Sequence, residues 1–160
     1  MDVRKIVRSK KRITKSGEWA SGTMPKAAFP LSKSGSKAYR LGNRRWRVVS
    51  FDACELNCRL LINYNANLSQ YQAILGVEAR GDMKVLAFLE FHPTHKPWHV
   101  HVCCQDISAV SPGIKRGPWQ KNMNGTGQRH KMKCPDTDQT AYNRAVSFFR
   151  LDHSDDGGLV

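Results

Sequence analysis

The sequence contains no apolar run long enough to cross a membrane, and no apolar segment follows its basic first residues. A membrane-spanning helix needs about 20 mostly apolar residues. A secretory signal needs a shorter apolar core behind a basic start. We therefore expect a soluble, cytoplasmic protein that is neither secreted nor bound to a membrane.

Cysteines are few and odd in number, with five among 160 residues and no regular spacing. This pattern argues against a disulfide framework and for reduced thiols. Cys54 and Cys58, together with Cys103 and Cys104, are a loose match to a zinc site, but cysteine also packs as a small hydrophobic residue. The length and a hydrophobic content of 40% predict one domain with a real core.

Acidic residues are scarce in the first third of the chain. Residues 1–47 contain 14 Lys/Arg and two acids, a net charge of +12 out of +13 for the whole chain. Such a segment binds polyanions by releasing their counterions, which makes nucleic acid the expected partner. Because residues 16–42 are rich in Gly, Ser, Pro and Lys, we predict a flexible basic segment over 1–42. A domain over 43–152 and a C-terminal tail over 153–160 complete the predicted organisation.

The chain is organised around the stretch Val85–Cys104, which reads as two strands joined by a polar loop with two prolines. Side chains alternate faces along a strand, so His99, His101 and Cys103 share one face. In a hairpin, Glu90 lies beside His99. One carboxylate and two imidazoles together suit a divalent cation. The alternative is a pair of polar histidines on a solvated sheet face, although a carboxylate that ends an apolar strand needs a partner or water.

Other segments are predicted from composition and spacing. Arg44–Phe51 is typical of a first strand. Ser69–Val77 reads as a helix with Ser69 as its cap. Asp52–Asn65 fits either a helix that begins at Asp52 or an extended segment, and the sequence leaves this open.

The clearest predicted helix is Asp136–Leu151, which Asp136 or Asp138 can cap. Tyr142 lies on its apolar stripe with Ala145, Val146 and Phe149, and is therefore expected to face the sheet. A tyrosine in this position is either a packed core residue or a catalytic one.

A long basic segment separates the hairpin from this helix. Trp119, with Lys115, Arg116 and Lys121 near it, suits stacking on an unpaired base with phosphate contacts beside it. The alternative is an exposed loop anchored by one buried Trp. The full set of candidate DNA contacts is Arg44, Arg45, Arg47, Lys115, Arg116, Trp119, Lys121, Arg129, Lys131, Lys133 and Arg144.

These features resemble the HUH endonucleases, on the side of the rolling-circle replication initiators (Rep proteins). Their His-hydrophobic-His signature corresponds to His99-Val100-His101. A third metal ligand from the preceding strand falls on Glu90, and the nucleophilic tyrosine on the later helix falls on Tyr142. The resemblance covers roughly residues 44–151.

The resemblance implies an α+β fold, in which a central antiparallel sheet carries helices on one side in a ferredoxin/RRM-like topology. It implies that Glu90, His99 and His101 hold Mg²⁺ or Mn²⁺, with Zn²⁺ as the second choice, to polarise the scissile phosphate. Tyr142 would then nick and rejoin single-stranded DNA, or a DNA hairpin, through a phosphotyrosine intermediate. The expected setting is rolling-circle replication of a plasmid or phage in a bacterial host, with a host helicase or polymerase as a further partner.

Two departures from the initiator pattern keep other functions open. Ala145 stands where many initiators have a lysine one turn after the tyrosine, and no GxxxxGK[ST] motif for a fused helicase is present. One alternative is a DNA-binding protein on the same fold that does not cleave, such as a repressor or a competitor of an initiator. Another is a zinc-stabilised nucleic-acid-binding module.

Overall fold

The computed structural model describes residues 1–160 except 35–37, 40–41, 94–96, 118–119, 125–131 and 153–160, and only the backbone of 38–39 and 120–124. The helices are α1 (Val3–Arg8) and α2 (Asp138–Phe149), with short 3-10 turns η1 (Lys26–Ala28), η2 (Ser32–Ser34) and η3 (Ile107–Ala109). The strands are β1 (Lys11–Ser16), β2 (Ala20–Ser21), β3 (Met24–Pro25), β4 (Ala38–Tyr39), β5 (Arg45–Ala53), β6 (Leu56–Asn65), β7 (Gln70–Ala79), β8 (Asp82–Phe91), β9 (Trp98–Cys103), β10 (Gln120–Asn124) and β11 (Leu151–Asp152).

One large mixed sheet dominates the described part of the chain. Its strands follow the order β10-β9-β8-β7-β6-β5-β1-β11, with β2 paired to β5. From β5 to β10 each strand pairs antiparallel with the next one in the sequence, whereas β1 and β11 pair in parallel. The fold is therefore of the α+β class. The strand order does not confirm the ferredoxin-like topology, in which helices connect successive strands.

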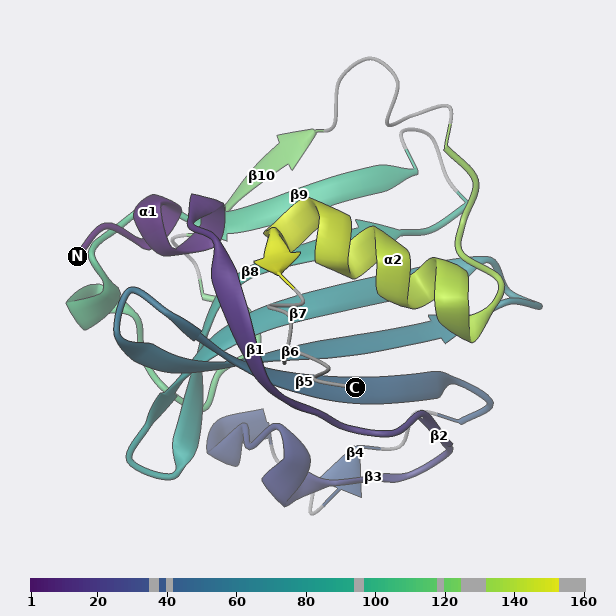
Figure 1. The fold of residues 1–160 in the computed structure, drawn as a ribbon, viewed down its shortest axis with the longest axis horizontal. Helices are drawn as coiled ribbons and strands as arrows, with labels where there is room; N and C mark the ends of the chain where they lie inside the picture. Colours follow the sequence, from purple (N-terminus) through teal and green to yellow (C-terminus); the bar gives the residue numbers. More distant parts are fainter. Residues whose placement is uncertain (35–37, 40–41, 94–96, 118–119, 125–131, 153–160) are drawn as a thin grey trace, which may run out of the picture.

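Both helices pack on the same face of this sheet, which we call the helical face (Figure 1). The helical face presents apolar side chains from every long strand, among them Phe51, Leu60, Leu75 and Leu89. Ala141, Ala145 and Phe149 of α2, and Val3 and Ile6 of α1, bury their side chains against it. No helix among the described residues is both long and apolar enough to cross a membrane.

The opposite face of the sheet is covered over only part of its area. Met24, Phe29 and Leu31 pack there on a smaller apolar cluster that includes Ile74 and Phe88. Figure 1 shows this covering segment as the short elements that run beside β5. The remainder of this face, beyond Phe88, is lined by polar side chains, and we call it the polar face.

The prediction of a flexible segment over residues 1–42 was wrong for the part that the structure describes. α1 packs on the helical face, and β1 occupies a place inside the sheet between β5 and β11. Val3, Ile6, Met24 and Phe29 are fully buried. Val3 and Ile6 have helical spacing, but that pattern is too short to predict a helix by itself, and Met24 and Phe29 belong to no local period.

The prediction of a helix over Ser69–Val77 was also wrong, because this segment lies within the central strand β7. β7 is buried on both faces, which removes the polar-apolar alternation that marks a half-exposed strand. Asp52–Asn65 is extended: positive φ angles at Cys54 and Glu55 close a tight turn between β5 and β6. The long basic segment between the hairpin and α2, residues 105–136, was interpreted from its composition as a loop, but it contains η3 and β10.

Three predictions for the site region were confirmed. β5 covers the expected first strand, and β8 and β9 form the expected antiparallel hairpin. α2 begins and ends within two residues of the predicted helix. Its N-cap is Thr137, which forms a capping box with Thr140, rather than Asp136 or Asp138.

Candidate functional site

The polar face carries a row of directly paired side chains that crosses strands β5 to β9. Trp46 pairs with Asn63, Asn63 with Gln72, Gln72 with Glu90, and Glu90 with His99. Directly paired residues in antiparallel strands point to the same face of the sheet and touch. We call these five residues the polar row. Asn63 and Glu90 are buried at 2% and 7% exposure, so their polar atoms need partners.

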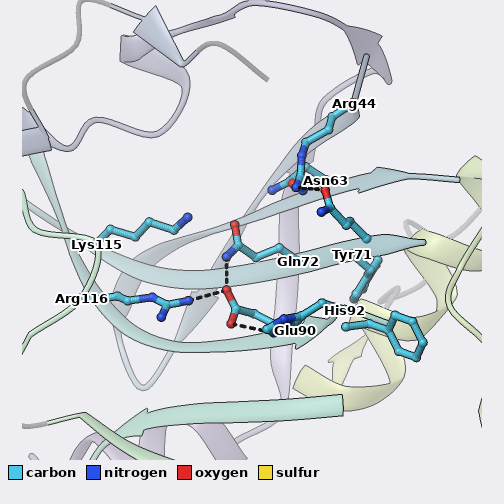
Figure 2. A pocket seen from close by; sticks show the side chains of 10 residues that line it. Arg44, Asn63, Tyr71, Gln72, Glu90, His92, Lys115 and Arg116 are labelled. Atoms are coloured by element: carbon cyan, nitrogen blue, oxygen red, sulfur yellow. Dashed lines mark hydrogen bonds and ion pairs between the residues drawn. The ribbon is translucent and has the colours of Figure 1, made fainter. Parts of the chain in front are cut away.

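Glu90 is the only carboxylate of this row, and several side chains of the site converge on it (Figure 2). Its Oε1 accepts a hydrogen bond from Gln72 Nε2 and an ion pair from Arg116 Nη2 at 2.7 Å. Its Oε2 lies 3.4 Å from His101 Nε2 and 3.8 Å from His92 Nε2. The carboxylate thus has neighbours on both adjacent strands, on the 113–117 loop and, in His92, just after the end of its own strand.

A close backbone contact places that loop over the polar face. Gly113 has φ +81°, and its N–H donates to Met83 O at 2.8 Å while its carbonyl accepts from Lys33 N–H at 3.0 Å. A Cβ at this position would lie 2.6 Å from Asp82 Oδ2, so only glycine allows the approach. Lys115 and Arg116, two and three residues after Gly113, enter the site from this side, as Figure 2 shows.

Arg44 lies on the other side of the site, just before β5. Its guanidinium donates to Asn63 Oδ1 at 2.7 Å and to Gln70 Oε1 at 2.5 Å. Both acceptors are neutral amides, so the positive charge is held in place without being neutralised. Burial holds the pKa of Arg44 and the pKa of Lys115 below their ordinary values, and the nearby charge of Glu90 acts in the opposite direction.

The histidines line the continuation of this face toward β10. The His92 and His99 rings are 4.8 Å apart, and the His99 and His101 rings 6.5 Å apart, measured between centroids. His101 also packs on Phe88 at 4.6 Å. Burial lowers the pKa of His101, and Glu90 opposes that shift. His101 is therefore held toward its neutral form.

The expected chelating residues are brought together, but they do not form a metal-binding group as they stand. Glu90 lies opposite His99, as the sequence predicted, and His101 is close. However, the guanidinium of Arg116 already occupies one carboxylate oxygen, and no set of three His, Cys, Asp or Glu among the described residues is arranged to hold a metal. The divalent cation thus stays a prediction, and no chemical step is derived through it.

Tyr142 does not lie with these residues. It faces the sheet, as predicted, but it packs on the helical face, whereas Glu90, His99 and His101 are on the polar face. Its ring lies under the guanidinium of Arg47 at 4.4 Å, and burial raises the pKa of its hydroxyl. The sheet itself separates this tyrosine from the predicted metal ligands, so its assignment as the nucleophile of that centre was wrong.

The predicted DNA contacts are divided between the two faces. Arg44, Lys115 and Arg116 gather on the polar face. Arg45 pairs with Asp138 at 2.6 Å and Arg47 covers Tyr142, both on the helical side, and Arg144 lies over Trp98 there. Lys133 is exposed. Trp119, Arg129 and Lys131 lie outside the described residues, as does the side chain of Lys121.

Sequence reasoning missed the amide residues of the site. Asn63 and Gln72 lie inside largely apolar strands, as Glu90 does, and Gln70 begins one. A polar residue inside a strand buried on both faces requires a partner, and this signal was available in the sequence. Their register with Glu90 was not available, because it depends on the turns that join β6, β7 and β8.

Comparisons of the chain with protein-family models, with curated proteins and with solved structures found no match. The functional argument therefore rests on the geometry of the polar face.

Proposed function

We propose that this protein binds single-stranded DNA on the polar face of its sheet. The observation that supports this best is the polar row with the cations Arg44, Lys115 and Arg116 at its sides. Amide and imidazole groups on a sheet surface match the hydrogen-bonding edges of bases. Those edges are accessible in an unpaired strand, and the cations suit its phosphates.

The charge of the chain supports the same partner. Its net charge of +13 favours association with a polyanion over long range. Within the described residues, neither Arg44 nor Lys115 has a carboxylate within ion-pair distance. These two charges are therefore available to a phosphate without breaking an existing ion pair.

Fluorescence anisotropy with labelled strands of about 20 nucleotides tests the proposal. We expect single-stranded DNA to bind more tightly than the corresponding duplex. Arg44→Gln with Lys115→Met should weaken binding and reduce the slope of log affinity against log salt by about 0.7 for each phosphate that is no longer neutralised. Arg80→Gln with Lys5→Met is the matched control. It removes the same amount of positive charge from residues outside the pocket, one in the turn that joins β7 to β8 and one in α1. Equal effects of the two pairs would show that the polar face is not the binding surface.

A second candidate is the metal-dependent nicking and joining of DNA that the HUH resemblance implies. The specific observation in its favour is the placement of Glu90 opposite His99, with His101 at 3.4 Å from the carboxylate. Tyr142 is not its nucleophile. Incubation of single-stranded DNA with Mn²⁺ tests this candidate: strand cleavage that is lost in His99→Ala with His101→Ala would favour it over binding alone.

A further inference from the structure

The polar face contains a pocket of about 370 Å³ between Arg44 and the 113–117 loop. Figure 2 shows Arg44 on one side of this pocket and Lys115 with Arg116 on the other. Asn63, Gln70 and Gln72 form its amide floor, and Glu90 lies at its base. The pocket is thus built from charged and hydrogen-bonding groups on several strands and one anchored loop.

The charges in this pocket do not balance. Glu90 and Arg116 form an ion pair at 2.7 Å and neutralise each other. Arg44 and Lys115 have no carboxylate partner among the described residues, so the pocket keeps two positive charges that burial makes costly. An anion that enters would relieve this cost.

The floor also offers hydrogen-bond donors. Asn63 and Gln70 use their amide oxygens to accept hydrogen bonds from Arg44. Their amide nitrogens are therefore not engaged by this arginine. Within the described part of the chain, neither nitrogen has an acceptor. Arg44, Lys115 and the two amides together provide donors of the kind that recognise phosphate oxygens.

The balance of charge selects between two kinds of phosphate. An internal phosphodiester carries one negative charge, whereas a terminal phosphomonoester carries about −1.5 to −2 and three strong acceptor oxygens. As a single group, the monoester matches two unpaired cations better than one phosphodiester does. We propose that this pocket binds the terminal phosphate of a nucleic-acid strand, an inference that rests on the proposed binding of single-stranded DNA.

Competition binding with one DNA sequence in three forms tests the proposal: with a 5′-phosphate, with a 3′-phosphate and with hydroxyl groups at both ends. We expect one phosphorylated form to bind about tenfold more tightly than the hydroxyl form. Lys115→Met and Arg44→Gln should each remove this preference, and Lys5→Met and Arg80→Gln should keep it. Thermal unfolding of each variant checks that it is folded.

Three outcomes would overturn the inference. Equal affinity of the wild type for all three forms would do so without any variant, and would leave the proposed function intact. A preference that survives in both Lys115→Met and Arg44→Gln would place the phosphate elsewhere. If a deoxynucleoside 5′-monophosphate alone competes as strongly as the phosphorylated strand, the ligand is a free phosphomonoester rather than a strand end. Failure of every strand to bind would instead contradict the proposed function.

Discussion

The aromatic donors of the helical face and the amide and ammonium donors of the polar face differ in how they are paired, although Arg47 Nε and Arg144 Nε on the helical side also lack a partner among the described residues. On the helical face, Tyr64 donates to Asp138 at 2.6 Å, Tyr71 to the carbonyl of Ala141 at 3.0 Å, and Trp98 to the carbonyl of Met132 at 3.0 Å. On the polar face, the amide nitrogens of Asn63 and Gln70 and the ammonium of Lys115 have no acceptor among the described residues. The first arrangement is that of a core, and the second is that of a site prepared for a ligand.

The largest effect is expected on the helical face. Phe149→Ala removes a fully buried ring from α2 and should lower the free energy of unfolding by about 3–5 kcal/mol. Urea denaturation measures this loss, and Ser147→Ala on the exposed side of the same helix is the control. A loss below about 1 kcal/mol would mean that α2 does not hold the core together.

A pH effect should follow from Lys11, which lies at 1% exposure behind α1 and α2. Its Nζ donates to Val7 O, Ser9 O and Phe149 O at 2.6–2.8 Å, and burial lowers its pKa to about 8. Between about pH 8 and 10 the unfolded chain then binds more protons than the folded one, so stability should rise with pH.

The size of this rise should be on the order of 2 kcal/mol relative to Lys11→Met, measured by urea denaturation at both pH values. If the difference between wild type and variant is the same at about pH 8 and pH 10, Lys11 titrates in the folded protein as it does in the unfolded chain.

On the polar face, Glu90→Gln should lower the stability of the protein and at the same time raise its affinity for DNA. Loss of the carboxylate leaves Arg116 without its ion pair, and we expect the free energy of unfolding to fall by about 1–2 kcal/mol. The same change adds positive charge to the pocket, so single-stranded DNA should bind several-fold more tightly.

A double-mutant cycle with Arg116→Met sharpens this test, because the second substitution removes the unpaired cation. The destabilisation by Glu90→Gln should be smaller in the Arg116→Met background. Weaker DNA binding by Glu90→Gln would contradict this electrostatic prediction, since it would mean that the carboxylate contributes a direct contact that outweighs its negative charge.

The smallest effect is expected for Tyr142→Phe. This change removes one oxygen and keeps the ring under Arg47, so the free energy of unfolding should change by less than about 1 kcal/mol. DNA affinity should equal that of the wild type in the same anisotropy assay. A large loss of binding would show that nucleic acid reaches the helical face as well.

Local sequence patterns were sufficient to predict elements whose structure depends mainly on their own residues. The hairpin of β8 and β9 was predicted because prolines and a polar loop separate two β-prone runs, and α2 because its apolar residues follow a helical period. The pairing of Glu90 with His99 followed from the same hairpin and was confirmed.

The features that could not be predicted from the sequence depend on contacts between residues that are distant in the chain. β7 looked helical because it is covered on both faces, and β1 looked unstructured because its partners β5 and β11 are distant in the chain. The two sides of the sheet could not be assigned to Tyr142 and His99 in advance, since a helix can pack on either face. The neighbours of Glu90 on β7 and on the 113–117 loop depended on strand register and on loop placement, so they too were known only from the structure.

The place of β1 in the sheet has a consequence for how the chain folds. Strands β5 to β10 pair with sequence neighbours and can form as soon as each hairpin is complete. β1 is made before all of them, yet Lys11 donates to the carbonyl of Phe149, 138 positions away. The pairing of β1 with β5 can form early, but its contacts with α2 and β11 are completed only after those two elements have been made. We therefore expect the amides of β5 to β9 to be protected from hydrogen exchange early in refolding, and the amide of Lys11, which donates to Arg150 O, to be protected in the slowest step.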